Sequence, residues 1–294
     1  MQISVNVLGR RGPDAAVSCL RHLGDRLPEG VRIRFLDDGS QPEVAQAVGR
    51  LSAEIEILSL PYDHGFAGAH NRGLRRAFSL GDDAVLMLSE DARPRTGFLE
   101  PLVEVMKWRP RAALVSPKIL LAGSAGSAER IWYAGGAIDW WRGLALHRGA
   151  GSEDRGGFDR PEPTDFATAV AMLVRRQAFD RTGPMDESYF NHLHDVDWSV
   201  RARRVGMEVH YQPRSVVRYE APGAGTTDTR AAIDRGAPAE LARELVRSRL
   251  RLVANHGRWY HWPAVGPRVA AEATQGALRS WRRRDVPPPG GPSA

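Results

Sequence analysis

Strand-like and helix-like segments alternate along the first part of the chain, and this alternation limits the folds that it can adopt. The strand-like segments are 3–8, 32–36, 54–60 and 84–88, and the helix-like segments between them are 14–27, 42–52 and 71–80. Strands joined by helices in this way form a parallel sheet with crossover helices. The sequence therefore predicts an α/β fold with a mostly parallel, Rossmann-like sheet flanked by helices.

The rest of the chain predicts further elements and a helical extension. In order these are a helix at 98–108, a strand at 112–120, a hairpin or irregular region at 132–146, a surface loop at 149–165, a strand at 166–175, a helix from 176, a helix at about 195–206, strands at 209–211 and 215–219, and an amphipathic basic helix at 239–255. We expect the α/β domain to span 1–228, a helical extension packed on it to span 229–280, and a disordered tail to span 281–294. Segment 222–238 is either a linker or a mobile lid.

Acidic and glycine-rich motifs follow three of the predicted strands. They are Asp37-Asp38-Gly39-Ser40, the segment from Asp63 to Gly73, and Glu90-Asp91. Ligands of such sheets bind beyond the carboxyl ends of the strands, so these motifs are expected to meet at one site. Each motif also has a purely structural interpretation, because aspartates and glycines form tight turns that bind nothing.

A fourth motif places acidic residues at the start of a later helix. Asp195 and Asp197 follow an aromatic turn in the stretch from Met185 to Arg203. A carboxylate at such a position is either a catalytic base or a residue that stabilises the helix N-terminus. Asp197 stands four residues before Arg201, which favours an ion pair along the helix.

In their order and spacing, the four motifs resemble those of inverting family 2 glycosyltransferases, especially the rhamnosyltransferase-like branch. The resemblance covers roughly residues 3–257. It implies a GT-A fold and an enzyme that moves a hexose or deoxyhexose from a nucleoside diphosphate sugar to a hydroxyl acceptor with inversion. Asp195 matches the general base, which removes the proton of the acceptor hydroxyl.

The resemblance also assigns residues to the nucleotide sugar. Asp37 is the first choice for the base ring, and Asn71 is expected to open a helix whose amides face the diphosphate. Arg72 is a candidate for phosphate contact. The full set is Gly9, Arg10, Asp37, Asp38, Gly65, Asn71, Arg72 and Glu90.

A divalent metal, Mg²⁺ or Mn²⁺, commonly screens the leaving diphosphate in this family. Asp91 matches its carboxylate ligand, and Glu90 is a second candidate. Where the family often has a histidine as second ligand, this chain has Tyr219-Glu220, which leaves metal dependence open. The first strand also departs from the family, because Gly9-Arg10-Arg11 replaces Thr-Tyr-Asn, and an arginine near the diphosphate can compensate.

Candidates for the acceptor pocket are aromatic residues and one histidine. They are His194, Trp140, Trp141 and Tyr219, and Trp132 and Tyr133 can extend the same platform for sugar faces. His194 stands where the family usually has glutamate, so it either tunes Asp195 or packs in the core. A glycan, a lipid-linked or a small-molecule acceptor fits this pocket equally well.

Composition limits the cellular compartments and the partners expected for this chain. The chain of 294 residues has a net charge of +6, carried almost wholly by arginine, but it has no recognised nucleic-acid motif, so no nucleic-acid partner is expected. Cys19 is the single cysteine, which excludes a disulfide scaffold. The sequence shows no signal-peptide pattern and no apolar run of bilayer length. We therefore expect a cytoplasmic protein; peripheral contact with the inner membrane face and homodimerisation are left open.

Two other functions fit the same motifs. The departures at Arg10, His194 and Tyr219 are the reason to keep one alternative, a catalytically silent relative that binds a nucleotide or sugar. A nucleotidyltransferase is the weaker alternative, because no lysine-bearing glycine loop stands near the start of the chain.

Overall fold

The computed structural model describes residues 1–39, 42–121, 128–189, 192–220 and 239–272. The chain divides into two compact units, of which unit 1 comprises residues 1–137 and 147–225 and unit 2 comprises residues 138–146 and 226–294. Several predictions fall outside the described residues: those for Ser40, for Phe190 and Asn191, for segment 222–238 and for the tail from 281. The predicted domain boundaries at 228 and 280 also lie there and stay predictions.

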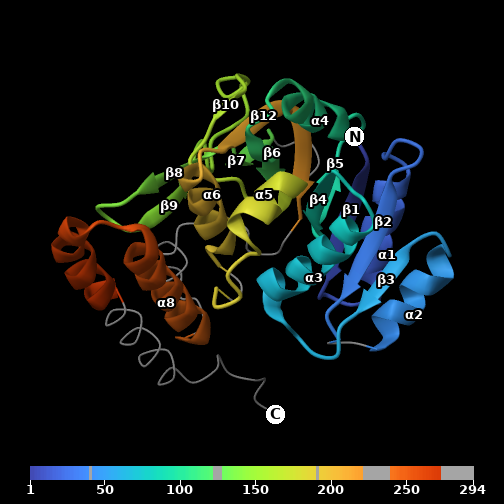
Figure 1. Ribbon diagram of the computed structural model, residues 1–294, viewed down its shortest axis with the longest axis horizontal. Coiled ribbons are helices and arrows are strands. Elements are labelled where there is room, and N and C mark those ends of the chain that lie inside the picture. The colour runs from blue at the N-terminus through green and yellow to red at the C-terminus, as the bar shows by residue number, and fades with distance from the viewer. Residues whose placement is uncertain (40–41, 122–127, 190–191, 221–238, 273–294) are drawn as a thin grey trace, which may run out of the picture. The chain divides into compact units, whose positions relative to one another are not determined.

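Unit 1 contains a mostly parallel sheet (Figure 1). Its strands are β1 (Ile3–Gly9), β2 (Arg32–Asp37), β3 (Glu56–Ser59), β4 (Ala84–Ser89), β5 (Ala92–Pro94), β6 (Ala112–Leu121), β7 (Arg130–Tyr133), β10 (Glu162–Pro163), β11 (Ala171–Arg175) and β12 (Glu208–Tyr219). The spatial order is β10-β12-β6-β11-β4-β1-β2-β3, with β5 beside β12 and β7 beside β6. Strands β3, β2, β1 and β4 are parallel, β11 is antiparallel to both of its neighbours, and β12 is parallel to β6. The predicted α/β fold is confirmed.

The helices of unit 1 pack against this sheet and hold the later segments of the unit in place. They are α1 (Pro13–Gly24), α2 (Pro42–Leu51), α3 (Gly65–Ser79), α4 (Leu99–Trp108), α5 (Arg176–Thr182) and α6 (His194–Arg204). One buried core joins α3, α5 and α6 to β4, β6, β11 and β12, with Trp198 of α6 and Met172 of β11 among its members. Burial of this apolar surface therefore positions the N-terminus of α6 relative to β4.

The last two predicted strands form one continuous strand, β12. Its register against β6 shifts between Gln212 and Val216, around Pro213. Proline has no N–H to donate to a sheet, so the chain passes this point as an irregularity instead of ending the strand. The predicted strand at 166–175 is shorter than expected, because only Ala171–Arg175 joins the sheet.

Unit 2 contains α8 (Ala239–His256), drawn in orange in Figure 1, and the 3₁₀ turn η1 (Trp259–His261). The tip of the hairpin formed by β8 (Gly136–Asp139) and β9 (Leu144–His147) also belongs to it. Val253, Val265 and Val269 form its core, which agrees with the helical spacing predicted at 239–255. Within the described ranges, no helix has both the length and the apolar character needed to cross a membrane.

Candidate active site

The carboxyl ends of β1, β2 and β4 lie side by side in unit 1. Gly9 is in register with Asp37, and Leu8 is in register with Ser89. Asp38 follows β2 directly, and Glu90-Asp91 follows β4, so the predicted strand-end motifs share one edge of the sheet.

Arg10 links the acidic residues of three segments. Its Nε lies 3.0 Å from Asp38 Oδ2, and its Nη2 lies 2.8 Å from Asp63 Oδ2. Its backbone N–H donates to Glu90 Oε1 at 2.6 Å. One residue after β1 thus draws together the end of β2, the loop before α3 and the end of β4.

Arg11 pairs with the predicted metal ligand Asp91. Beside this pair, burial raises the pKa of Glu90 to about 7, and the charge of Asp91 acts in the same direction. Burial and the Asp91 charge also raise the pKa of Tyr219 to about 12. The N–H of Glu220 donates to the Asp91 carbonyl at 2.9 Å, so the position of the usual family histidine does lie beside Asp91.

Asp195 lies next to the same edge of the sheet. Its Oδ2 accepts a hydrogen bond from Ala169 N at 3.0 Å, and its Oδ1 accepts one from Val196 N at 2.9 Å. The residue after Ala169 is Val170, whose carbonyl accepts the N–H of Ser89 at 2.9 Å. The fourth motif therefore lies within a short chain of contacts from the acidic end of β4.

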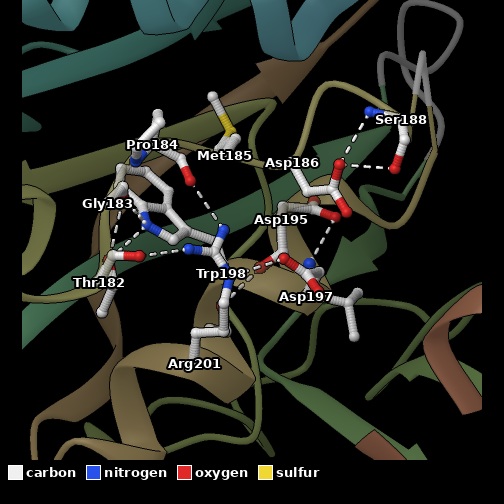
Figure 2. A network of polar contacts seen from close by, with 12 residues as sticks. Thr182, Gly183, Pro184, Met185, Asp186, Ser188, Asp195, Asp197, Trp198 and Arg201 are labelled. Carbon is white, nitrogen blue, oxygen red and sulfur yellow. Dashed lines mark hydrogen bonds and ion pairs between the residues drawn. The ribbon is translucent and has the colours of Figure 1, made fainter. Parts of the chain in front are cut away.

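Asp197 has a structural contact, as the sequence predicts. Its Oδ2 lies 2.8 Å from Arg201 Nε. Arg201 also donates to the Thr182 carbonyl at 2.6 Å, and Trp198 Nε1 donates to Thr182 Oγ1 at 2.7 Å. Figure 2 shows this network, which fastens α6 to the end of α5. Asp195 takes no part in the Asp197–Arg201 pair, since its carboxylate bonds to backbone amides instead.

The prediction that Asn71 opens a helix is wrong. Helix α3 begins at Gly65, so Asn71 lies well inside it and is fully buried. Its side chain donates to the Met185 carbonyl and accepts from the Met185 N–H, both at 2.9 Å, and donates to Glu187 Oε1 at 3.1 Å. These contacts hold the start of the Asp195 motif against α3.

Local packing and backbone geometry explain why glycine stands at two positions predicted for the nucleotide site. A Cβ on Gly9 would lie 2.1 Å from the ring of Phe35, so only glycine lets this ring pack under the end of β1. Gly65 has a φ of 69°, which favours glycine, and its N–H donates to Asp63 Oδ1 at 2.7 Å. Arg72 donates to the Gly68 carbonyl at 2.8 Å and is partly exposed. The roles of these residues in nucleotide binding stay predictions.

His194 packs in a buried ring stack. It lies 4.8 Å from Phe66 between ring centroids, and Phe66 lies 4.4 Å from His70. Burial lowers the pKa of His194 and lowers that of His70 to about 3, which favours the neutral form of both rings. Neither ring nitrogen of either histidine has a hydrogen-bond partner among the described residues.

The aromatic residues predicted as one acceptor platform divide between the units. In unit 1, Trp132 lies 4.9 Å from Tyr219 and 4.4 Å from His147 between ring centroids. Trp140 and Trp141 belong to unit 2. Their acceptor roles, and that of Tyr219, stay predictions.

Several residues of this arrangement were given no role from the sequence. The sequence names Arg11 only as part of a departure from the family pattern and Asp63 only as the start of the second motif. Ala169 contributes a backbone N–H, for which a side-chain pattern carries no signal.

Comparison with known proteins identifies the family. The sequence profile of glycosyl transferase family 2 matches residues 10–183, more than half of the chain. This chain belongs to glycosyl transferase family 2. The matched segment includes Arg10, Asp38 and Asp91 and ends before Asp195, so membership of family 2 does not by itself assign the base.

Characterised relatives of this family 2 chain are distant. It is 23% identical to the N-acetylglucosaminyl-diphospho-decaprenol L-rhamnosyltransferase of Mycobacterium tuberculosis, over 79% of this chain and 78% of that protein. It is 21% identical to the low-salt glycan biosynthesis hexosyltransferase Agl10 of Haloferax volcanii, over 69% of this chain and 66% of that protein. The chain thus spans slightly less than two thirds of the Haloferax protein.

Two solved structures share the fold. GalNAc-T7 with UDP, GalNAc and Mn²⁺ matches 97% of this chain and 54% of that one, at a TM-score of 0.67 and 15% identity. The mannosyltransferase PcManGT of Pyrobaculum calidifontis with GDP-Man and Mn²⁺ matches 97% and 88%, at a TM-score of 0.56 and 13% identity. These likenesses confirm the predicted GT-A fold of the family 2 chain.

The end of β4 offers oxygen ligands that suit a hard divalent cation. Asp91 supplies a carboxylate, and Glu90 Oε2 is buried with no hydrogen-bond partner. Across the residues that the structure describes, no three His, Cys, Asp or Glu side chains form a metal cluster. Magnesium sites often use one or two carboxylates together with substrate phosphates. The donor set therefore fits a cation shared with a diphosphate, provided that Arg11 moves off Asp91.

Proposed function

We propose that this family 2 protein transfers a hexose or deoxyhexose from a nucleoside diphosphate sugar to a hydroxyl acceptor with inversion, and that Asp195 is the general base. The observation that carries the proposal is the position of the Asp195 carboxylate. Two backbone amides hold it, one of them on Ala169, beside the edge where Asp38, Glu90 and Asp91 gather. Family membership supports the transfer of a glycosyl group.

The proposed step needs one base on the acceptor side. The acceptor oxygen attacks the anomeric carbon from the face opposite the diphosphate, and its proton passes to the Asp195 carboxylate. The bond from that carbon to the diphosphate oxygen breaks, and its electron pair leaves with the nucleoside diphosphate. The amides of Ala169 and Val196 keep the carboxylate in one orientation, which favours this transfer.

The second requirement is that the negative charge on the leaving diphosphate is stabilised. Arg10 and Arg11 stand where the family places a nucleotide-binding segment. One guanidinium group can bind two phosphate oxygens at the same time. A divalent cation held by Asp91, with Glu90 beside it, would supply further stabilisation of the leaving diphosphate when bound.

The similar proteins supply candidates for the donor and the acceptor. The Mycobacterium protein is named for L-rhamnosyl transfer to a decaprenol-linked diphosphate sugar, which supports a deoxyhexose donor and a lipid-linked acceptor. The solved relatives carry UDP and GDP derivatives, so both uracil and guanine donors need testing. A thermal-shift screen of nucleoside diphosphates with and without Mn²⁺ identifies the base, because a bound nucleotide stabilises the folded state.

Asp195→Asn tests the proposed base. With a donor and acceptor identified, kcat should fall by about 10²- to 10⁴-fold, because the amide cannot take the acceptor proton. Affinity for the nucleoside diphosphate, measured by thermal shift, should stay close to wild type. Asp197→Asn is the matched control: it removes a buried ion pair on the same helix, so it should lower stability and leave kcat near wild type.

The outcomes separate the functions that fit the motifs. A kcat for Asp195→Asn within about tenfold of wild type would exclude Asp195 as base. A wild-type protein that binds nucleoside diphosphates but transfers no sugar from any donor would instead be a silent binding relative. The anomeric configuration of the product, read by NMR, tests inversion.

A further inference from the structure

Unit 2 exposes a cluster of large aromatic side chains. Trp259 is 82% exposed, Trp141 is 56% exposed and Trp262 is 39% exposed. Tyr260 lies between two of them, with ring centroids 5.8 Å from Trp141 and 5.9 Å from Trp259. We call these four residues the aromatic patch. Single exposed apolar residues are ordinary, but Tyr260 joins Trp141 to Trp259, and Trp262 follows two residues later, so these rings form a patch of the kind that marks an interaction surface.

Two arginines border the aromatic patch. The Arg258 guanidinium lies over the Tyr260 ring, 5.9 Å from its centroid, and Arg268 donates to the Trp141 carbonyl at 3.4 Å. Both side chains are exposed. In the sequence between Glu244 and Glu272 there is no acidic residue, whereas there are five arginines, of which only Arg249 is buried, and Asp139 near Trp141 is paired with Arg142. The surface therefore suits a partner that is anionic and also accepts apolar rings.

The base under the patch is well packed. Arg249 of α8 is buried, pairs with Glu272 and donates from Nε to the Gly143 carbonyl at 3.0 Å. A Cβ on Gly143 would lie 2.9 Å from Val253 Cγ2, so the segment that carries Trp141 packs closely on α8. His261 adds a ring contact of 5.2 Å to Trp141. The exposed rings thus project from a fixed support within unit 2.

We propose that the aromatic patch docks unit 2 on a membrane surface that contains anionic lipids. Tryptophan and tyrosine favour the boundary between headgroups and acyl chains, since their rings are apolar and their N–H and O–H groups stay hydrated. Arginines at the same level attract anionic headgroups. The proposal is independent of the glycosyl-transfer chemistry. It also does not require the basic face of α8 to contact the membrane, because the rings lie at 141 and 259–262, outside that helix.

Vesicle co-sedimentation of the full chain tests the proposal. Wild-type protein should bind vesicles of phosphatidylcholine with phosphatidylglycerol more tightly than vesicles of phosphatidylcholine alone, and binding should weaken with salt. Trp259→Ala with Trp262→Ala should weaken binding to both by at least about tenfold, because the insertable rings are lost. Arg258→Gln with Arg268→Gln should remove the preference for the anionic vesicles.

Trp108→Ala is the matched control. Trp108 is 83% exposed on α4 in unit 1, so it resembles Trp259 in type and exposure but lies outside the patch. This variant should bind vesicles like wild type. The Trp259/Trp262 variant should keep the wild-type thermal transition and its transfer rate with a water-soluble acceptor, which separates this test from that of the proposed function.

Three results would overturn the proposal. One is no sedimentation of wild type with either vesicle. Another is an equal loss of binding in Trp108→Ala and in the patch variant. The third is a dimer in sedimentation velocity that Trp259→Ala dissociates, which would make the patch a contact between copies of this chain.

Discussion

At the scale of single residues, the carboxylate of Asp91 already has a cation beside it. Arg11 pairs with Asp91, and this hydrogen bond is the main cause that raises the pKa of Arg11, so the guanidinium stays charged. A divalent metal that binds the Asp91 oxygens must displace Arg11. If Asp91 binds the metal as predicted, Arg11 and the metal compete for it in the absence of a donor.

Removing Arg11 should strengthen metal binding. For Arg11→Ala we expect Mn²⁺ titrated calorimetrically into the free protein to bind up to about fivefold more tightly, because a partly exposed ion pair contributes up to about 1 kcal/mol. Arg76→Ala is the control, since Arg76 pairs with Glu56 at 2.6 Å on an exposed part of α3. Weaker Mn²⁺ binding in Arg11→Ala than in wild type would contradict the competition.

The pairs that the sequence could predict are local. Asp197 and Arg201 are one helical turn apart, so their contact follows from helix geometry alone. Arg10 meets Asp38, Asp63 and Glu90 only because β1, β2 and β4 end at the same edge and the loop after β3 reaches it. The order of strands predicts that these segments converge, but not which side chains pair.

At the scale of elements, α3 shows why a glycine-rich motif misleads. Glycine disfavours helices, and the predicted helix begins only at Asn71, after Gly65 and Gly68. In the structure α3 begins at Gly65, and a glycine farther along it is needed for packing: a Cβ on Gly73 would lie 2.6 Å from Asn6 Nδ2 and 2.8 Å from Leu36 Cδ2. Close contact between helix and sheet outweighs the local preference.

Asn71 of α3 should act mainly as a structural clamp. Asn71→Ala would leave the buried Met185 N–H without its partner, and we expect a loss of about 2–3 kcal/mol in the free energy of unfolding, measured in urea. Hydrogen exchange should increase at 185–189, the segment that leads to Asp195. Ser79→Ala, which removes an exposed hydroxyl contact on the same helix, should change stability by less than about 0.5 kcal/mol.

A different result would support the predicted role of Asn71 in nucleotide binding. If Asn71→Ala kept wild-type stability and lost only affinity for the nucleoside diphosphate, the side chain would act on the ligand. The clamp would then be dispensable.

At the scale of the whole molecule, the sequence predicts the fold class better than the connections between distant segments. The alternation of strands and helices predicts the parallel half of the sheet, because each strand there is joined to the next by a single helix nearby in the sequence. The antiparallel insertion of β11 between β4 and β6 depends on pairings of Leu173 with Leu86 and with Val115, which are far away along the chain, and it has no sequence signature. The contact of Gly143 with Val253 is equally non-local, which is why 138–146 was not grouped with the C-terminal helix.

Two buried histidines should make the stability of the whole molecule depend on pH. Burial lowers the pKa of His70 from 6.5 to about 3 and also lowers that of His194, although Asp195 and Asp197 partly oppose the shift at His194. The fold favours the neutral form of both rings, whereas the unfolded chain binds a proton on each below about pH 6.5. The contribution of His70 to the free energy of unfolding is therefore fully present above about pH 6.5 and is lost below it, by up to about 1.4 kcal/mol per pH unit, and His194 acts in the same direction.

His70→Leu should reduce this acid sensitivity, because leucine has a similar volume and takes up no proton. In urea unfolding at about pH 8 and about pH 5, the loss of stability should be about 2 kcal/mol smaller in His70→Leu than in wild type. His22→Leu, at a half-exposed position of α1, controls for the loss of a histidine as such and should keep the wild-type loss. An equal loss in His70→Leu and wild type would show that His70 accepts a proton without unfolding. Because His194 directly precedes Asp195, protonation of the ring stack in the folded state would then disturb the proposed base before the rest of the molecule unfolds.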